Sequence, residues 1–451
     1  MIMADRGNFG SRLGIILATA GSAVGLGNVW RFPFMTGQNG GAAFILVYLA
    51  CVLLLGIPGM ISEFIVGRHA QANAAQAYGL FGGRWKWVGY LGILTATIIL
   101  GFYAVVAGWC LQYLVASVMG QLDSDAQYVT LYFQQFSTHP LKPCLWAAAF
   151  VLITHTVVVR GIRSGIERAS KLLMPILLVL LVVIVVASCL LPGAVKGIEF
   201  LFKPDFTKLS GGVFLEALGQ AFFSLSLGTA CLCTYASYYN RSTNLARSAL
   251  QIALLDSAIA ILAGLMIFPA AFSVGVQPDS GPSLIFITLP NVFREAFAPV
   301  PALGYAISVM FYVLLVFAAL TSTISMHEIG TAFFTEELKM PRKRAAWVLT
   351  GVCICLAIGC SLSIGNRPAL RFFGMSLMEL CDFITAQLML PAGAFLTSIL
   401  IGWFADHQMV RSEFTNQGTL RGSLFRAYLF SVKYIVPACI LLILLHECGV
   451  V

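Results

Sequence analysis

Charged residues are scarce in this sequence. Only 10% of its 451 residues are Asp, Glu, Lys or Arg, while 59% are hydrophobic, and about a quarter of an average soluble chain is charged. So few charges cannot cover a surface that faces water, and we therefore expect membrane lipid to surround most of the chain. The net charge of +8 does not indicate a nucleic-acid partner, because the basic residues stand in short loops between apolar runs.

Motifs for catalysis and for structural metals are missing as well. The sequence contains no HExxH, no GxSxG and no paired CxxC motifs, and its twelve cysteines are scattered, many within apolar runs. This pattern favours buried packing over disulfides or zinc ligation. We also expect no cleavable signal peptide, because the first apolar run, which begins near Leu13, lacks a clear small-residue cleavage site.

Eleven apolar segments are each long enough to cross a bilayer, which takes about 20 helical residues. Backbone polar groups find no water within hydrocarbon, so each segment should be a helix. The longest connections, at about 120–142, 192–212 and 275–301, contain no separate domain, and residues 1–451 should form a single transmembrane domain. In chain order, segments 1 to 11 run roughly 13–37, 42–67, 88–119, 143–159, 172–191, 213–238, 245–274, 302–335, 345–365, 376–404 and 427–446.

The distribution of Lys and Arg predicts the orientation. If the N-terminus is cytoplasmic, most Lys and Arg fall on the inner side, as cytoplasmic loops require. Eleven crossings then place the C-terminus outside. Short loops and termini suggest a bacterial inner membrane.

Segment 1 departs from the composition of an ordinary transmembrane helix. Gly21, Gly25 and Gly27 fall at mid-membrane, next to the polar Asn28. Glycine weakens a helix by about 1 kcal/mol relative to alanine. A helix-packing face of small residues is the alternative explanation, but it does not account for Asn28 or for the Arg31 that follows.

Segment 6 is interrupted in the same way, by Ser224, Ser226, Gly228 and Thr229. Unwound backbone survives in a bilayer only where protein buries it or where it lines a cavity. Interrupted helices at matching positions of two halves point to a transporter with its binding site between the halves. We predict one repeat at about 10–191, an inverted second repeat at about 213–404, and an extra helix at 427–446. The symmetry rests on spacing alone.

Several motifs resemble the neurotransmitter:sodium symporter family. RLGIILATAGSAVGLGNVWRFPFMTGQNGGAAF in segment 1 and GIPGMISEFIVGR in segment 2 carry the likeness most specifically, and SLSLG, TYASY, FITLP and LTSTIS extend it along essentially the whole chain. The resemblance implies an all-α membrane protein with a ten-helix core of two inverted repeats, broken helices 1 and 6, and here an eleventh helix. It also implies sodium-driven symport of amino acids by alternating access.

The resemblance further implies two sodium sites built from oxygen ligands, which hard cations prefer. Besides the substrate carboxylate, the first site would use a carbonyl and three side chains, from Ala23, Asn28, Ser224 and Asp256. The second would use three carbonyls and two hydroxyls, from Gly21, Val24, Ala318, Thr321 and Ser322. From the residues alone, hydroxyls bonded back to their own helix are the alternative for Thr321 and Ser322.

The same resemblance implies the substrate site. The substrate carboxylate should meet free amides near Leu26 and Gly27, because exposed N–H groups favour anions, together with the Tyr103 hydroxyl. The ammonium should meet carbonyls and hydroxyls of segments 1, 6 and 8, and apolar side chains should line the remaining wall; ordinary core packing is the alternative for these. The full set is Ser22, Ala23, Leu26, Gly27, Ile99, Tyr103, Phe223, Ser224, Ser226, Thr229, Ser322 and Met326.

Two positions bear on substrate choice. Family members that carry biogenic amines have Asp at the position of Gly25, so glycine there favours an amino acid with its own carboxylate. Several members have a large aromatic residue where this chain has Thr229. The smaller residue leaves room, and Met326 is adaptable, which favours bulky apolar or aromatic amino acids.

Charges inside spans are costly and usually functional. The resemblance implies an outer gate of Arg31 and Asp382, which closes above the substrate together with Phe223 and Tyr103. It implies an inner pair of Arg6 and Glu336, although many members have Asp at the second position.

Two further carboxylates lie within spans. Glu63 is expected to be a structural charge satisfied by segment 6. Asp256 stands close to Gln220, Ser224 and Tyr48 in the predicted fold, where several members have Asn. We hypothesise that Asp256 both ligates sodium and supplies a fixed negative charge, so that chloride is not required.

Other interpretations remain open. His155 and His327 could relay protons, but a histidine inside a helix bundle is more often simply hydrogen-bonded. A membrane enzyme lacks its motifs here, and a channel would need a repeated filter. An amino-acid sensor that binds without transporting could keep the same site. The residues do not give the oligomeric state.

Overall fold

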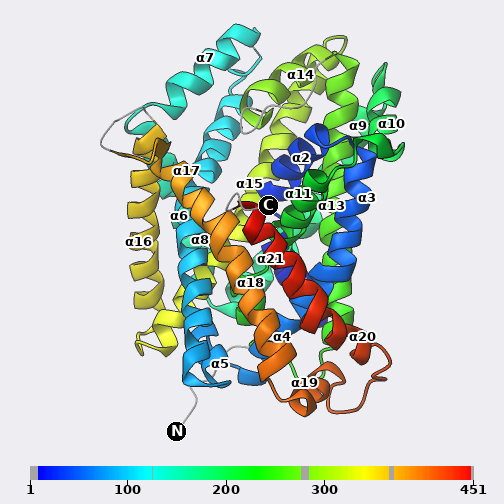
Figure 1. The fold of residues 1–451 in the computed structure, drawn as a ribbon. Coiled ribbons are helices and arrows are strands. Elements are labelled where there is room, and N and C mark those ends of the chain that lie inside the picture. The colour runs from blue at the N-terminus through cyan, green and yellow to red at the C-terminus, as the bar shows by residue number, and fades with distance from the viewer. Residues whose placement is uncertain (1–8, 124, 276–283, 365–369, 448–451) are drawn as a thin grey trace.

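Helices make up nearly all of the protein in the computed structural model, which describes residues 9–123, 125–275, 284–364 and 370–447 (Figure 1). In chain order the elements are α1 Arg12–Ala23, η1 Gly27–Arg31, α2 Phe32–Gln38, α3 Ala42–Cys51, η2 Val52–Gly56, α4 Ile57–Ala70, α5 Ala74–Gly79, η3 Gly83–Trp85, α6 Lys86–Val118, α7 Ala126–Ser137, α8 Lys142–Val158, η4 Ile162–Glu167, α9 Arg168–Cys189, α10 Ala194–Phe202, η5 Phe206–Lys208, α11 Gly211–Ser224, α12 Cys231–Ala236, α13 Leu245–Ser273, η6 Leu284–Thr288, α14 Leu289–Ala296, α15 Pro301–Glu336, α16 Arg342–Ile364, β1 Arg371–Phe372, β2 Met375–Ser376, α17 Leu377–Asp382, η8 Phe383–Met389, α18 Leu390–Ile399, η9 Leu400–Phe404, α19 His407–Phe414, α20 Phe425–Phe430, η10 Ser431–Ile435 and α21 Val436–Glu447.

All eleven predicted segments are helical. Among the residues that the structure describes, eight uninterrupted helices are long and apolar enough to cross a membrane, and α1 with the helix at 27–38 forms a ninth span bent by 55°. Of the other two segments, α8 has 17 residues, while segment 6 is divided into α11 and α12. The prediction of an all-helical membrane protein is confirmed, and the repeat boundaries at 10–191 and 213–404 remain predictions.

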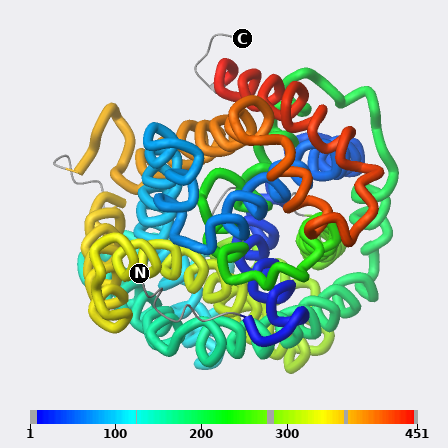
Figure 2. Tube along the Cα trace, turned by 90° about the horizontal axis from the view of Figure 1, so that it is seen from below, coloured from blue at the N-terminus to red at the C-terminus, as the bar shows by residue number. Residues whose placement is uncertain are grey.

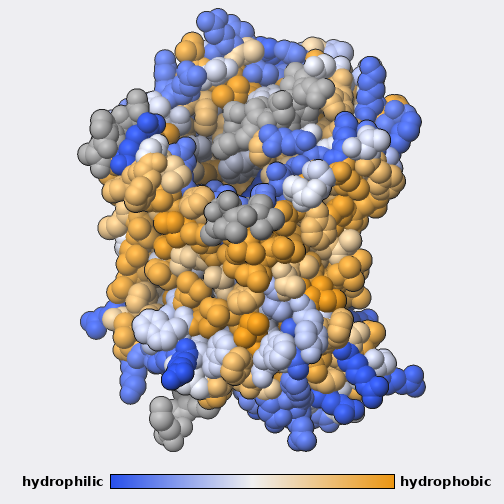
Figure 3. All heavy atoms as spheres, in the orientation of Figure 1, coloured by the Kyte–Doolittle hydropathy of each residue, from blue (hydrophilic) through white to orange (hydrophobic). Residues whose placement is uncertain are grey.

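The surface reflects this composition. In Figure 3 an apolar band crosses the middle of the molecule and hydrophilic residues gather at both ends. Large apolar side chains such as Leu54, Val179 and Phe404 are exposed, which would be costly in water but is favourable in lipid. The band therefore marks the depth of the bilayer.

The connections sort to the two ends of the bundle. In Figure 1, α7, α10 and α14 lie at one end, and α5, α19 and α20 lie at the other. Each of the three long connections contains a helix. Asp125 begins α7 by accepting a hydrogen bond from the amide of Tyr128. Between α16 and α17, β1 and β2 form a short antiparallel hairpin.

Segment 1 lies inside the bundle. Helix α1 packs against α9, α13 and α15, and most of its residues from Gly14 onward are buried. Viewed along the bundle in Figure 2, α16 and α21 lie at the rim, and their apolar stretches are only 39% buried. The two broken segments are therefore shielded from lipid, as unwound backbone requires.

Candidate functional site

The break in segment 1 is short. Helix α1 ends at Ala23, Val24 has an extended conformation (φ −70°, ψ 109°), and π-helix η1 begins at Gly27. The amide of Gly25 donates to Asn28 Oδ1 at 3.1 Å. A Cβ atom on Gly25 would stand 2.5 Å from Ser322 Oγ, so a side chain at this position would have to displace the Ser322 hydroxyl.

The break in segment 6 spans 225–230. Ser226, Gly228 and Ala230 all have positive φ values, of 53°, 82° and 58°. The amide of Gly228 donates to Glu63 Oε1 at 2.7 Å. This bond brings Glu63 against the break in segment 6, as predicted.

Segment 6 also touches segment 10 through the main chain. A Cβ atom on Gly228 would lie 2.1 Å from the carbonyl oxygen of Leu390, and one on Gly393 would lie 2.7 Å from the carbonyl oxygen of Gly228. The unwound stretch therefore packs backbone against backbone, without an intervening side chain.

Side chains predicted for the first sodium site converge. Asn28 Nδ2 donates to Asp256 Oδ1 at 2.7 Å, Ser224 Oγ donates to Asp256 Oδ2 at 2.6 Å, and Asn28 Nδ2 lies 3.3 Å from Ser224 Oγ. Segments 1, 6 and 7 each contribute one of these buried residues. Tyr48 adds a hydroxyl 3.4 Å from Asp256 Oδ2. Ala23, whose carbonyl was predicted for this site, ends α1 nearby in the chain.

The donor set suits a hard cation. Among the described residues, no group of three or more His, Cys, Asp and Glu side chains could hold a metal. The oxygens around Asp256 carry one carboxylate among neutral groups, the balance expected for a monovalent cation beside a charged substrate.

Residues of the second predicted site also meet. Ser322 Oγ donates to the carbonyl of Val24 at 3.2 Å, and Thr321 Oγ1 lies 3.4 Å from the same carbonyl. Thr321 also donates to the Ala318 carbonyl at 3.0 Å, so the bonding to its own helix is present as well. A Cβ atom on Gly21 would lie 3.2 Å from Thr321 Cβ. Segments 1 and 8 therefore approach closely at this point.

The predicted substrate site lies between the two breaks. The amide of Leu26 donates to the Tyr103 hydroxyl at 3.0 Å, and Ser226 Oγ donates to the Ser22 carbonyl at 3.2 Å. A Cβ atom on Gly27 would lie 3.0 Å from the Phe223 ring. Donors and acceptors of the kind that bind a carboxyl or an amino group therefore meet here, each paired within the protein.

The predicted side-chain wall comes from helices that reach this site. Ile99 stands one turn before Tyr103 on α6, and Met326 one turn after Ser322 on α15, where residues four apart share a helix face. Thr229 is buried, and its hydroxyl is engaged by the Ser226 carbonyl at 2.7 Å.

Of the predicted gate residues, Arg31 stacks its guanidinium 4.3 Å from the centre of the Phe223 ring, and its charge is close enough to interact with Asp382. Glu336 Oε2 accepts hydrogen bonds from the Asn73 amide at 2.6 Å and from Asn73 Nδ2 at 3.1 Å. The predicted partner Arg6 lies outside the described residues.

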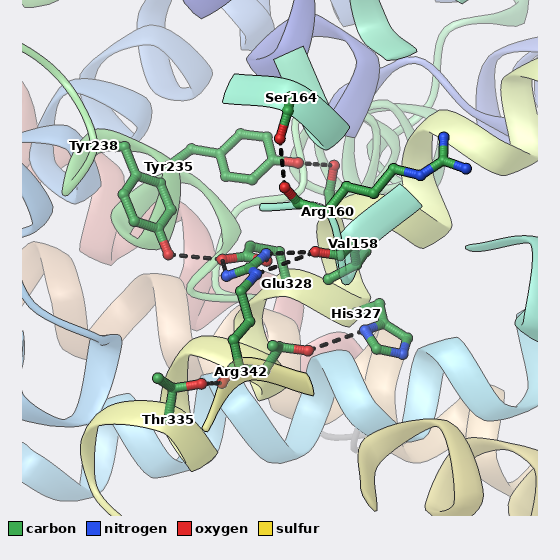
Figure 4. Close-up of polar contacts among 11 residues, drawn as sticks. Val158, Arg160, Ser164, Tyr235, Tyr238, His327, Glu328, Thr335 and Arg342 are labelled. Carbon is green, nitrogen blue, oxygen red and sulfur yellow. Dashed lines mark hydrogen bonds and ion pairs between the residues drawn. The ribbon is translucent and has the colours of Figure 1, made fainter. Parts of the chain in front are cut away.

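A second polar cluster escaped the sequence analysis (Figure 4). Glu328 lies on segment 8 and is fully buried. Its carboxylate accepts hydrogen bonds from the Arg342 guanidinium at 2.5 and 3.1 Å and from the Tyr238 hydroxyl at 2.8 Å. Arg342 also donates to the Val158 carbonyl at 2.8 and 3.1 Å. The cluster joins segments 4, 8 and 9 to the residues just beyond α12. A lone carboxylate inside the predicted span 302–335 was the available signal.

The two histidines within spans share one neighbour. His155 Nδ1 and His327 Nε2 each lie 2.9 Å from Thr350 Oγ1, and His327 Nδ1 lies 3.0 Å from Thr331 Oγ1. This agrees with the prediction of hydrogen-bonded bundle residues.

A buried arginine of α4 holds together α19, the turn that follows it and the loop before α13. Arg68 Nε pairs with Glu413 Oε2 at 2.7 Å, and its Nη1 donates to the Thr243 carbonyl at 2.6 Å and to Asn416 Oδ1 at 2.9 Å. Burial alone would raise the pKa of Glu413, but the hydrogen bond from His69 and the charge of Arg68 outweigh it, so that the pKa lies below its usual value. The sequence analysis did not single out Arg68, because it stood at the predicted end of segment 2.

Comparisons with known proteins agree with this architecture. The profile of the sodium:neurotransmitter symporter family matches residues 6–136 and 138–450. The uncharacterized sodium-dependent transporter YhdH of Bacillus subtilis (strain 168) is 37% identical over 98% of this chain and 97% of its own length. An uncharacterized sodium-dependent transporter of Haemophilus influenzae is 33% identical over 98% of each chain. The crystal structure of MhsT in complex with L-phenylalanine is 40% identical, with a TM-score of 0.89 over 98% of this chain and 100% of that one.

Proposed function

This chain belongs to the sodium:neurotransmitter symporter family, and we propose that it couples the uptake of bulky hydrophobic amino acids to the entry of sodium. Membership makes it a multi-pass membrane transporter rather than an enzyme. The observation that carries the finer proposal is the meeting of Asn28, Ser224 and Asp256 beside two helix breaks that expose backbone donors and acceptors.

The substrate class follows from the shape and chemistry between the breaks. Gly25 leaves no carboxylate to pair with an amine, so the substrate should bring its own carboxylate, which the amide of Leu26 and the hydroxyl of Tyr103 can bind. MhsT was solved with L-phenylalanine, and its likeness to this chain supports an aromatic or bulky apolar side chain. Thr229 and Met326 would leave room for it.

Coupling follows from shared ligands. In the proposed first site the substrate carboxylate completes the sodium coordination, so each ligand raises the affinity of the other by the same factor. Sodium in the proposed second site would join segment 1 to segment 8 through Val24 and Ser322. Both ions then favour the conformation closed to the cytoplasm, and loss of sodium to the cell interior allows the inner end to open.

Asp256 is proposed to replace chloride. It is fully buried and accepts hydrogen bonds from Ser224 and Asn28, so its charge lies directly at the first site. The sodium- and chloride-dependent GABA transporter 2 of Macaca fascicularis, 25% identical over 88% of this chain, carries chloride dependence in its name. Gln220, one turn before Ser224, is buried with neither side-chain polar atom hydrogen-bonded.

Substitution of Asp256 by Asn tests this. The variant should lose transport or transport only with chloride, while transport by the wild type should be indifferent to chloride. Asp205→Asn, which removes an exposed carboxylate outside the spans, is the control and should behave as the wild type. Chloride-indifferent, unimpaired transport by the Asp256→Asn variant would sink the idea.

We place the N-terminus in the cytoplasm and the C-terminus outside, because this orientation puts most Lys and Arg residues on the cytoplasmic side of the membrane. Protease protection of tags fused to each end of the chain in inverted vesicles tests this orientation. Digestion of the C-terminal tag in such vesicles would contradict it.

The decisive experiment is uptake into proteoliposomes. Labelled amino acids are offered with sodium outside, and with potassium outside as the control. Accumulation of phenylalanine-like substrates that depends on sodium supports the proposal, and binding that depends on sodium without accumulation favours a sensor. Accumulation that ignores sodium would mean that the ion sites are misassigned.

A further inference from the structure

Glu167 holds the cytoplasmic end of segment 1 against segment 5. Its carboxylate is buried at the end of η4. Oε2 accepts the amide hydrogen of Gly10 at 2.6 Å, and Oε1 accepts the hydroxyl of Ser11 at 2.9 Å and the ammonium of Lys171 at 2.6 Å. Because the Gly10 amide precedes α1, no carbonyl of that helix can bind it.

The approach depends on missing side chains. A Cβ atom on Gly14 would lie 2.2 Å from Glu167 Oε1, and one on Gly10 would lie 2.7 Å from Arg163 Nε. Segment 5 therefore fills the space that two side chains of segment 1 would otherwise occupy.

A second contact follows two turns further up both helices. A Cβ atom on Gly21 would lie 3.4 Å from Met174 Sδ and 3.2 Å from Thr321 Cβ. Gly14 and Gly21 are seven residues apart, as are Glu167 and Met174, and seven residues rise about 10.5 Å in a helix. The two helices therefore run parallel and in step, so a contact at the lower end also fixes the height of the upper end.

The upper end of α1 carries the proposed second sodium site. Val24 presents its carbonyl there to Ser322 and Thr321 on segment 8. A shift of α1 by even a fraction of a turn would move this carbonyl out of reach, because ligand distances tolerate only a few tenths of an ångström.

We propose that Glu167 is a positioning residue for the second sodium site, which it serves by fixing α1 on segment 5. The inference rests on the proposed sodium coupling. A residue that merely caps α1 would affect stability but would leave the affinity for sodium unchanged in the folded protein.

Two variants test this from opposite helices. Glu167→Gln keeps the shape but removes the charge, and Gly14→Ala places a methyl group where the carboxylate lies. Each should raise the sodium concentration for half-maximal substrate binding by about fivefold. Glu167→Gln turns charge-assisted hydrogen bonds into neutral ones that are roughly half as strong, and the methyl group of Gly14→Ala displaces the carboxylate from its contacts. Substrate affinity at saturating sodium should stay unchanged. Lys171→Gln, which leaves the contacts to Gly10 and Ser11, is the control.

Binding of labelled substrate to purified protein is measured against sodium, with thermal unfolding as a check of folding. If the wild type shows no sodium dependence, the proposed function fails. If the wild type depends on sodium and both folded variants match it, the role of Glu167 is refuted. A loss of substrate affinity at saturating sodium that is as large as the loss at low sodium would also refute it, since that would reflect general damage to the substrate site. Should Glu167→Gln not fold, Gly14→Ala decides alone.

Discussion

Arg342→Met is expected to lower the free energy of unfolding substantially, because it removes the guanidinium that neutralises Glu328. The carboxylate of Glu328 is fully buried and accepts three hydrogen bonds, two from Arg342 and one from Tyr238. After the substitution it would keep only the one from the Tyr238 hydroxyl. Breaking a buried ion pair from one side costs about 3–5 kcal/mol. The Arg342 side chain is 27% exposed, so water screens part of the loss, and we expect about 3 kcal/mol.

A double-mutant cycle separates the pair from its surroundings. Glu328→Gln alone should cost about 1–2 kcal/mol, since Arg342 keeps its bonds to the Val158 carbonyl. The double variant should cost only about 1–2 kcal/mol as well, because no uncompensated charge remains. The coupling energy would then be about 2–4 kcal/mol.

Unfolding is followed by titration of sodium dodecyl sulfate into protein in mixed micelles, monitored by circular dichroism. Lys86→Gln is the control, because it breaks an ion pair with Glu337 whose side chains are 36% and 19% exposed, and such pairs contribute at most about 1 kcal/mol. Additive single losses, with no recovery in the double variant, would refute the reasoning that Glu328 is charged and neutralised by Arg342.

Three further outcomes are expected. Gly25→Ala should abolish substrate binding in a filter assay, because its Cβ would stand 2.5 Å from Ser322 Oγ; a variant that binds like the wild type would contradict the site. Thr321→Ala should raise the sodium concentration for half-maximal uptake while leaving the protein folded, and an unchanged sodium curve would remove that hydroxyl from the second site. Stability should fall in acid as Glu413 is protonated. The hydrogen bond from His69 and the charge of Arg68 lower the pKa of Glu413 in the folded state. Its contribution to stability is therefore present above the unfolded pKa of about 4.3 and is lost as pH falls through the folded value. Glu413→Gln should flatten this part of the profile, measured as thermal unfolding against pH.

Hydropathy sufficed to predict the eleven segments, because a backbone in lipid has almost no alternative to a helix. Glycines and polar residues marked both breaks, because such residues weaken a helix in mid-membrane, where unwound backbone survives only if protein buries it or it lines a cavity. The sequence did not reveal which ends of helices meet. Glu167 stood in a predicted loop, and only the structure shows that its carboxylate accepts a hydrogen bond from the Gly10 amide at the start of segment 1.

The site was predictable only as far as a motif fixed it. Asn28, Ser224 and Asp256 lie far apart in the chain, and hydropathy alone gives no reason to bring them together; the family resemblance did. Glu328 could have been found from its charge within an apolar span, but its partner Arg342 begins the next helix and could not have been paired with it without the fold.

The main-chain contact of Gly228 with Leu390 and Gly393 constrains how related chains can diversify. Any side chain at either glycine would collide with the opposite backbone, so this contact between segments 6 and 10 is closed to variation by substitution. Changes of substrate preference among relatives should therefore accumulate elsewhere in the proposed site, on segments 3 and 8, where Ile99 and Met326 can change size without moving a backbone. A library aimed at new substrates would be smallest and most productive at those two positions.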